Sequence, residues 1–376
     1  MNRDLNTLPV APHARRPRGA VRLNGVLVPG WESWEVDNNV YRAADTFSVS
    51  FAVGALPAAY GANWFSQQTG IQCEIFANED PADPDNYSPA ESERLILGQV
   101  DDINFSPVAG TITITGRDLT AWFIDTKTNE GYLNKTASQI ATLLASRKGL
   151  TPVVTATTTL AGTYYNQNHI SLTQERSEWD ILCELARFED FDVFVTGKEL
   201  HFQPKPADTG ERYAIVWTPP SDAFGSPDAN VINFDHDRSL TIAKGVVVKV
   251  TSWNSGRKRK FTAVWPRGAS TTKPGQSGAS SPIVYPKNYP GLTQDGCLQR
   301  AQMIYRQITQ HMMKLSADLP ADNLLTCSNI VQVRGTGTAW DQDYYPDSVK
   351  RSMSVGEGYR MTVTAKNISA DLEDTL

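Results

Sequence analysis

The stretch that most constrains the fold of this chain is Leu97–Asp125, LGQVDDINFSPVAGTITITGRDLTAWFID. It predicts one strand over Val100–Phe105, a short turn, and a second strand over Thr111–Gly116 in which threonine and isoleucine alternate strictly. Such alternation is typical of an antiparallel sheet with one buried face. Three bulky apolar side chains follow at the same edge of the sheet: Leu119, Trp122 and Phe123. We therefore expect a small β-barrel that these side chains cap.

The residues before this hairpin extend the pattern. The segments Val21–Val28 and Ser33–Tyr41 predict a hairpin across Pro29 and Gly30, and Thr46–Val53 and Gly70–Ala77 predict further strands. Residues 18–125 are thus predicted to form a first β-barrel. Residues 1–17 contain three prolines and show no periodicity, which predicts a flexible N-terminal arm.

The period changes after residue 125. Thr136 and Gln139 form a capping box that predicts a short amphipathic helix ending at Gly149. A second helix is predicted over Ser177–Phe188, followed by a hairpin over 191–203. The side chains that define the buried face of that second helix are Trp179, Leu182, Cys183 and Ala186. Residues 126–205 therefore predict a small α+β module between two all-β regions.

A second β region is predicted to begin at residue 206. Its first part, 206–267, contains a long hairpin over 243–265, and residues 268–285 are rich in Gly, Ser and Thr, as in a flexible loop. Residues 286–376 contain the longest predicted helix, 294–314, then strands and an acidic tail. We expect this last part to complete a second barrel, so that the fold is mainly β with an α+β insert.

Composition excludes several classes of protein. The chain has 376 residues and a formal net charge of −6, whereas a protein that holds nucleic acid needs a basic face. No apolar run is long enough for a membrane anchor, and the N-terminus lacks the apolar core of a signal peptide. The four cysteines form no CxxC pair, which argues against a zinc ribbon or a disulfide framework. We expect synthesis and assembly in a cytoplasm.

Motifs for catalysis or cofactor binding are missing from the sequence. It contains no HExxH, GxSxG or GxxxxGK motif. Asp235-His236-Asp237 is the densest set of metal-ligand types, but neighbours on an extended chain point to opposite sides. The same geometry separates Asp101 from Asp102, and prolines disrupt ligand spacing in the acidic segment 78–93. We expect no enzyme activity, catalytic residue, cofactor or metal.

One basic turn is a candidate partner contact. It consists of Arg257, Lys258, Arg259 and Lys260. It is the only concentration of cationic side chains in the second half of the chain, and it lies at the tip of the predicted long hairpin. The alternatives are a contact with an acidic partner and a solvated hairpin tip.

The order of these segments resembles the baseplate hub proteins of contractile phage tails. In this group, the late control protein D group, the hub of Mu-like phages is most similar in length. The segments that carry the resemblance are TITITGRDLTAWFID at 111–125, the helix that ends in Lys148-Gly149-Leu150, WDILCELARFEDFDVFVTGKELHF at 179–202, and VGEGYRMTVTAKN at 355–367.

The resemblance implies that both β regions are copies of a tail-tube-like barrel. Three subunits would then close a homotrimeric ring with six barrel units around a channel. Such a hub joins the six-fold tail tube to the three-fold puncturing spike in the virion baseplate, and DNA passes through the channel without specific binding. The family supplies no catalytic residues.

Two other functions stay open at the level of sequence. The first is a tail-associated protein that binds or hydrolyses peptidoglycan, with the module at 126–205 as its working part. The second is the hub of a contractile bacteriocin or injection system, whose mechanical demands are the same as those of a phage tail. The role of the N-terminal arm, the partner surfaces, and whether a trimer forms without the spike are not determined by the sequence.

Overall fold

The computed structural model describes residues 3–6, 15–39, 43–132, 134–158, 176–189, 191–204, 210–220, 222, 225–240, 245–254, 258–269, 283–309 and 313–367. The chain divides into two compact units. Unit 1 comprises residues 1–212, 318–329 and 347–363, and unit 2 comprises residues 213–317, 330–346 and 364–376. The division falls within four strands, β14 (Glu211–Thr218), β20 (Met313–Pro320), β22 (Asp343–Ser354) and β23 (Gly358–Lys366). The predicted domains are consecutive segments of the chain, whereas these two units are interleaved along it. The division does not test the predicted boundaries, which stay a prediction.

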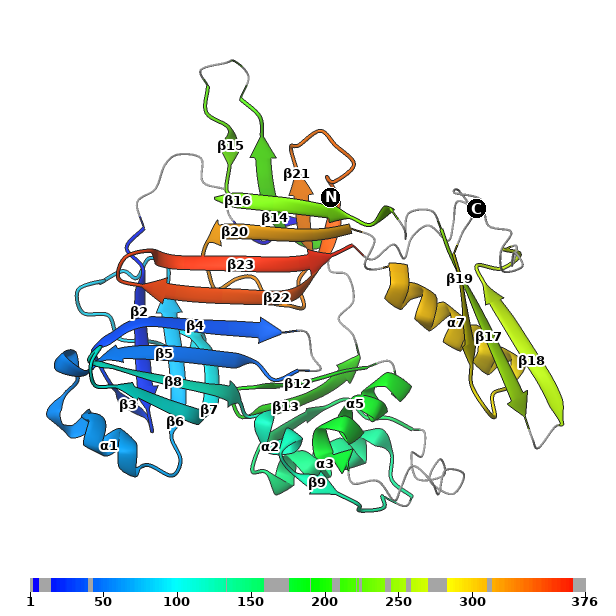
Figure 1. Ribbon diagram of the computed structural model, residues 1–376, viewed down its shortest axis with the longest axis horizontal. Coiled ribbons are helices and arrows are strands. Elements are labelled where there is room, and N and C mark those ends of the chain that lie inside the picture. Colours follow the sequence, from blue (N-terminus) through cyan, green and yellow to red (C-terminus); the bar gives the residue numbers. More distant parts are fainter. Residues whose placement is uncertain are drawn as a thin grey trace. The chain divides into compact units, whose positions relative to one another are not determined.

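Unit 1 is built on one antiparallel sheet (Figure 1). Its neighbouring strands follow the order β4–β5–β8–β7–β6–β2–β3, and the part of β22 in this unit pairs with β4. The strands are β2 (Arg18–Leu23), β3 (Val26–Leu27), β4 (Trp31–Asn39), β5 (Thr46–Ala52), β6 (Gln72–Asn78), β7 (Arg94–Ser106) and β8 (Thr111–Asp118). The short helices between them are η1 (Val53–Ala55), η2 (Ala58–Tyr60), α1 (Ala62–Gln67) and η3 (Glu91–Glu93).

Alternation along the strands produces the core of this sheet. On β5, Phe47, Val49 and Phe51 are buried while the residues between them are more exposed, as the sequence predicts. The predicted hairpin at the centre of the sheet is also present, because β7 and β8 pair over most of their length. Figure 1 shows β4 and β5 running across the direction of β2 and β6. Gly19 of β2 faces Trp34 of β4 so closely that a Cβ atom there would lie 2.7 Å from the indole nitrogen.

The sheet does not close into the expected barrel. Among the described residues no sheet closes on itself, and the strand order of unit 1 ends at β3. The structure also corrects the predicted hairpin across Pro29 and Gly30. Asn24 and Gly25 both have positive φ, at 50° and 80°, so the chain reverses there and β2 pairs with β3. Strand β4 pairs instead with β5 and β22.

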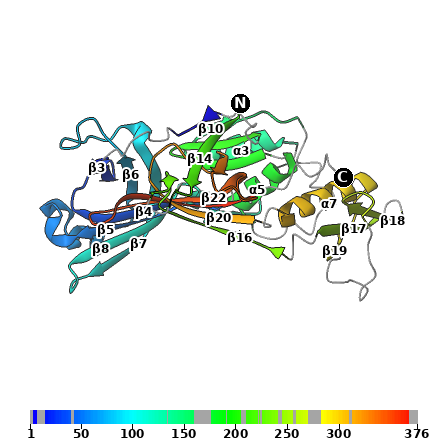
Figure 2. The ribbon, with the colours of Figure 1, turned by 90° about the horizontal axis from the view of Figure 1, so that it is seen from above.

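Helices and a second sheet follow the central hairpin within unit 1. The sheet has the order β10–β13–β12, and helices α3 and α5 pack against it (Figures 1 and 2). The elements are α2 (Ala121–Ile124), β9 (Lys127–Thr128), α3 (Ala137–Arg147), β10 (Thr151–Val154), β11 (Arg176–Ser177), α5 (Glu178–Glu189), β12 (Phe191–Thr196) and β13 (Glu199–Pro204). The predicted capping box is present, since the Thr136 hydroxyl accepts from the Gln139 backbone and the Gln139 side chain accepts from that of Thr136. All four side chains predicted for the inner face of the second helix are buried.

Unit 2 contains a three-stranded sheet covered on one face by a helix. The order is β18–β17–β19, and α7 packs against β17 and β18 (Figures 1 and 2). The elements are β17 (Val246–Asn254), β18 (Arg259–Trp265), β19 (Ile283–Asn288) and α7 (Gln294–Thr309). Their shared core is formed by Val246, Val248, Val250, Ala263, Cys297, Ala301 and Ile304.

The remaining strands of unit 2 correct the expected second barrel. They are β14 (Glu211–Thr218), β15 (Asp228–Ala229), β16 (Asn233–Arg238) and β21 (Val331–Arg334), together with parts of β20, β22 and β23; β1 (Arg3–Asp4) pairs with the start of β14. The hairpin β17–β18 pairs with β19 and not with these strands, so no second closed cylinder exists among the described residues. Helix α7 ends at Thr309, and β20 begins at Met313, where the sequence predicts helix. Most of the predicted loop 268–285 lies outside the described residues.

Candidate interaction surfaces

The central hairpin extends past its neighbouring strand. Strand β6 pairs with β7 only up to Gln99, whereas β7 continues to Ser106 with β8 on one side. A β-bulge between Val100 and Asp102 marks the change. Beyond the bulge β7 is an edge strand whose outer backbone groups have no strand partner among the described residues.

This edge carries uncovered apolar side chains. Ile103 and Phe105 lie opposite Ile114 and Ile112 of β8. They are therefore on the face of the sheet that, farther along the strands, is buried in the core. The two β8 side chains are fully buried, but Ile103 is 38% exposed and Phe105 is 47% exposed. The apolar face of the sheet therefore continues beyond the part of the core that this chain covers.

Acidic side chains lie beside the same edge. Arg117 on β8 binds Asp101 through two hydrogen bonds, at 2.6 and 3.0 Å, and binds Asp125 at 3.0 and 3.2 Å. These hydrogen bonds raise the pKa of Arg117, so the guanidinium stays charged. Asp102 is exposed and lines a shallow depression that Glu35 and Asp101 also border. This surface is negatively charged because the positive charge of Arg117 balances only part of the negative charge of the neighbouring carboxylates.

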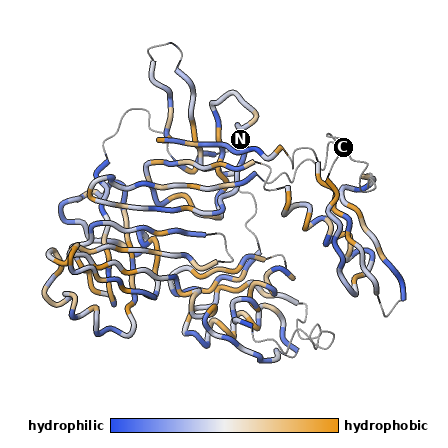
Figure 3. Tube along the Cα trace, in the orientation of Figure 1, coloured by the Kyte–Doolittle hydropathy of each residue, from blue (hydrophilic) through white to orange (hydrophobic). Residues whose placement is uncertain are grey.

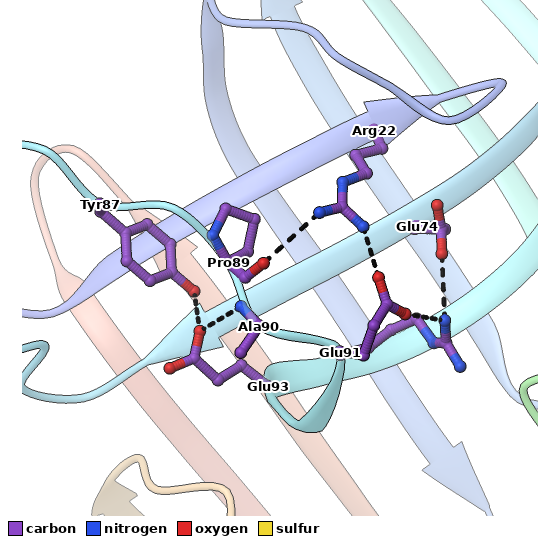
Figure 4. Close-up of polar contacts among 8 residues, drawn as sticks. Arg22, Glu74, Tyr87, Pro89, Ala90, Glu91 and Glu93 are labelled. Atoms are coloured by element: carbon purple, nitrogen blue, oxygen red, sulfur yellow. Dashed lines mark hydrogen bonds and ion pairs between the residues drawn. The ribbon is translucent and has the colours of Figure 1, made fainter.

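In unit 1, Glu91 and Glu93 connect the acidic segment 78–93 to the sheet through ion pairs and hydrogen bonds (Figure 4). Glu91 forms ion pairs with Arg22 of β2, at 2.7 Å, and with Arg94 of β7, at 2.5 Å. Glu93 accepts hydrogen bonds from the Ala90 backbone and the Tyr87 hydroxyl. These bonds, together with one from Asn78, lower the pKa of Glu93 although partial burial opposes ionisation. These two glutamates therefore have a structural role in the loop. In the described part of the chain, no group of metal-ligating residues occurs.

Two carboxyl groups lie close to the ends of β5 and β8: the half-buried Asp45 just before β5 and the buried Asp118 at the end of β8. Asp45 accepts hydrogen bonds from the Asn39 backbone at 2.8 Å and the Asn38 side chain at 2.7 Å. Asp118 accepts from the backbone and hydroxyl of Thr120. Burial raises the pKa of Asp45 to about 6. Burial and the charge of Asp45 raise the pKa of Asp118 to about 8.

The basic turn lies where the sequence predicts it, between β17 and β18. Arg257 is outside the described residues, whereas Lys258, Arg259 and Lys260 are described and exposed. Trp253 lies directly opposite Lys260 in the strand register and is 58% exposed. Figure 3 shows hydrophilic residues at this end of the hairpin and apolar ones where α7 covers it. The sequence identified the charges but missed the tryptophan, whose place opposite Lys260 depends on the pairing register.

The Asp235-His236-Asp237 segment lies on β16, where its histidine is part of an aromatic cluster. The His236 ring stacks on Trp340 with centroids 5.7 Å apart, and the Tyr344 hydroxyl lies 3.4 Å from Nδ1 of His236. Burial lowers the pKa of His236 despite the nearby charge of Asp341. The histidine therefore has a packing role in unit 2.

Comparisons with known proteins identify the fold. No model of a protein family matches the sequence, and no curated protein sequence matches it. Solved structures do match over nearly the whole chain. A tail protein from Neisseria meningitidis has a TM-score of 0.65 at 14% identity, covering 93% of this chain and 96% of its own. The chain has the fold of phage tail proteins.

Two further structures agree with this assignment. The 43 kDa tail protein of prophage MuSo2 from Shewanella oneidensis has a TM-score of 0.65 at 15% identity and covers 93% of this chain and 98% of its own. A prophage tail protein from Listeria monocytogenes has a TM-score of 0.55 at 10% identity and covers 94% of this chain and 95% of its own. The predicted resemblance to a phage tail protein is thereby confirmed for the fold. Within the described ranges, no helix is long and apolar enough to span a membrane.

Proposed function

We propose that this chain is the structural hub of a contractile-tail baseplate. Three copies form a ring that joins the six-fold tail tube to the three-fold spike and leaves a channel for DNA. The observation that carries the proposal is the phage tail protein fold, which extends over 93% of this chain and at least 96% of two tail proteins. The proposed role is structural, without catalysis and without a cofactor.

Open sheet edges support an assembly of copies. Both the outer end of β7 and the terminal strand β3 leave backbone groups without a strand partner in the described residues, and Val26 and Leu27 of β3 are exposed. Edges of this kind pair readily with other chains, and a closed ring satisfies them without open-ended growth. In a single copy, these backbone groups hydrogen-bond to water instead of to a strand.

The mass of the purified chain in solution tests the proposal. Light scattering coupled to size exclusion is expected to give a discrete species of three times 41.4 kDa, and negative-stain images of that species should show a ring with a central opening. A chain that stays at 41.4 kDa at every concentration, alone and with its spike protein, contradicts the hub. Clearing of purified peptidoglycan by this chain in a zymogram contradicts the purely structural role.

A further inference from the structure

Two exposed patches on this chain have complementary chemistry. The first, which we call the β7 edge, comprises Asp101, Asp102, Ile103 and Phe105 in unit 1. The second, which we call the basic tip, comprises Trp253, Lys258, Arg259 and Lys260 in unit 2. Each patch places an exposed apolar surface beside charge: the β7 edge keeps the negative charge of Asp102, since Arg117 binds Asp101, and the charges of the basic tip are positive.

The β7 edge has the features of an incomplete sheet. Its residues alternate between apolar side chains on the core face and the polar side chains of Asp102 and Asn104 on the other face. A monomer with this edge exposes Phe105 and an unpaired strand together, which is a template for an added strand. An incoming strand gains backbone hydrogen bonds and covers Ile103 and Phe105. Its charged side chains must be basic to suit Asp101 and Asp102.

The basic tip meets these requirements. It is the end of a two-stranded projection in which β18 is an edge strand of its own sheet. Trp253 and Lys260 share one face of that sheet, so an indole ring and an ammonium group lie side by side. A large aromatic side chain is the kind of anchor that fills an apolar site. Arg259, the first residue of β18, alternates with Lys260 and so lies on the opposite face from Trp253, where it can meet Asp102 while Trp253 meets Phe105.

We infer that the basic tip of one copy docks on the β7 edge of a second copy. This inference rests on the proposed assembly of copies and names the contact that holds it. Because the two patches differ, the contact is heterologous, and the proposed ring requires that the rotation between successive copies closes after three copies. The contact places unit 2 of each copy against unit 1 of the next.

Charge exchange between copies tests the contact. Asp102→Lys and Arg259→Glu each place like charges together, and each is expected to raise the dissociation constant of the oligomer about fivefold or more. The double variant exchanges the charges and is expected to restore the assembly. Lys287→Glu, on the opposite edge strand β19, removes the same charge from the same sheet and is the matched control, with no effect expected. Sedimentation velocity over a concentration series measures all four variants.

Apolar substitutions and a cross-link complete the test. Phe105→Asp is expected to weaken assembly at least tenfold, whereas Val108→Asp, at the 99% exposed turn of the same hairpin, leaves it unchanged. The pair Asp102→Cys with Arg259→Cys is expected to form disulfide-linked oligomers under oxidation, and Asp85→Cys with Arg259→Cys is expected to form none.

The outcomes separate this contact from the hub proposal. An oligomer that forms normally in the Asp102→Lys, Arg259→Glu and Phe105→Asp variants, and that gives no cross-link, overturns the docking contact and leaves the ring intact. A wild-type chain that stays monomeric overturns both. Assembly that responds equally to Lys287→Glu assigns the effect to overall charge and also overturns the contact.

Discussion

Single carboxyl groups make the stability of unit 1 depend on pH. Asp45 and Asp118 are connected through the backbone, where the Asp118 N–H donates to the Asp45 carbonyl at 2.9 Å. Their pKa values, about 6 and about 8, exceed the ordinary value of 3.8 because both carboxyl groups are shielded from water and, for Asp118, because of the charge of Asp45. Below pH 3.8 the folded and unfolded chains both hold these protons. As pH rises above 3.8, the unfolded chain loses these protons while the folded chain keeps them, so stability falls up to about pH 6 for Asp45 and about pH 8 for Asp118 and then levels off.

Asp118→Asn tests this pH dependence. The amide keeps the shape of the side chain and its bonding to Thr120 but cannot ionise, so the variant should not lose stability between pH 6 and 8 through this group. Wild type should lose up to about 1.4 kcal/mol per pH unit in that window relative to the variant. Thermal unfolding at a series of pH values measures the difference. Asp85→Asn, at an 80% exposed side chain, is the control, and a parallel pH profile for wild type and Asp118→Asn contradicts the assignment.

The sequence predicted the strand that ends at Asp118 but not the burial of its carboxyl group. An aspartate after an arginine at a strand end is typical of a solvated terminus, and Arg117 does lie on the surface with Asp101 and Asp125. Asp118 is buried because the start of β5 packs against it, through a contact with Asp45 seventy-three residues earlier. A local sequence pattern cannot reveal a contact between residues that are so far apart in the sequence.

At the scale of elements, two glycines allow β5, β8 and β7 to pack around one ring. A Cβ atom on Gly116 would lie 2.1 Å from the Gln99 carbonyl oxygen and 2.6 Å from the Phe47 ring. A Cβ atom on Gly98 would lie 2.7 Å from the same ring. Phe47 therefore covers both glycines, an arrangement in which an aromatic ring shields a strand backbone that has no side chain.

Gly116→Ala is expected to destabilise the chain by about 1–3 kcal/mol, because the nearest atoms belong to backbone and to a buried ring that cannot move freely. Denaturant unfolding followed by tryptophan fluorescence measures the change. Gly54→Ala is the matched control, since a Cβ atom there meets nothing within 4 Å. Equal stability of the two variants contradicts the packing role of Gly116.

The helices show how far element prediction reaches. Capping residues and apolar spacing located α3 and α5 because those signals lie within one turn of each helix end. Strand β20 was missed because Met313, Leu315, Ala317 and Leu319 follow directly on a helix, and the apolar residues before them continue a helical period. The core around α3 and α5 also includes Leu97, Leu119 and Phe123 from the central hairpin and the segment after it.

Phe123→Ala tests whether that core depends on the hairpin. The ring is fully buried and lies 6.4 Å from Trp179 of α5, so its removal leaves a cavity in a core shared by elements on both sides of residue 125. We expect a loss of about 3–5 kcal/mol. Hydrogen exchange should show faster exchange in both β8 and α5. Faster exchange in α5 alone would contradict a shared core.

At the scale of the whole molecule, the sequence predicted the class of fold better than its topology. Order and spacing of segments indicated a phage tail protein, and the solved tail proteins match it over nearly the full chain. Closed barrels were predicted because alternation shows which face of a strand is buried but not which strands become neighbours. Strand β22 pairs with β4 more than three hundred residues earlier, and no local pattern contains that pairing.

Salt dependence of assembly is the prediction that belongs to this largest scale. The proposed contact between copies joins the exposed acid Asp102 to the exposed bases Lys258 and Arg259, and exposed charges are screened over about 10 Å at 0.1 M salt and about 3 Å at 1 M. Raising NaCl from about 0.1 to about 1 M should therefore lower the average mass of the wild-type chain at fixed concentration. The apolar contacts of Phe105 and Trp253 strengthen slightly in salt, so a mass that stays constant or rises would show that charge does not hold the copies together. The exchanged variant, Asp102→Lys with Arg259→Glu, should respond to salt as wild type does, because its opposite charges are merely reversed.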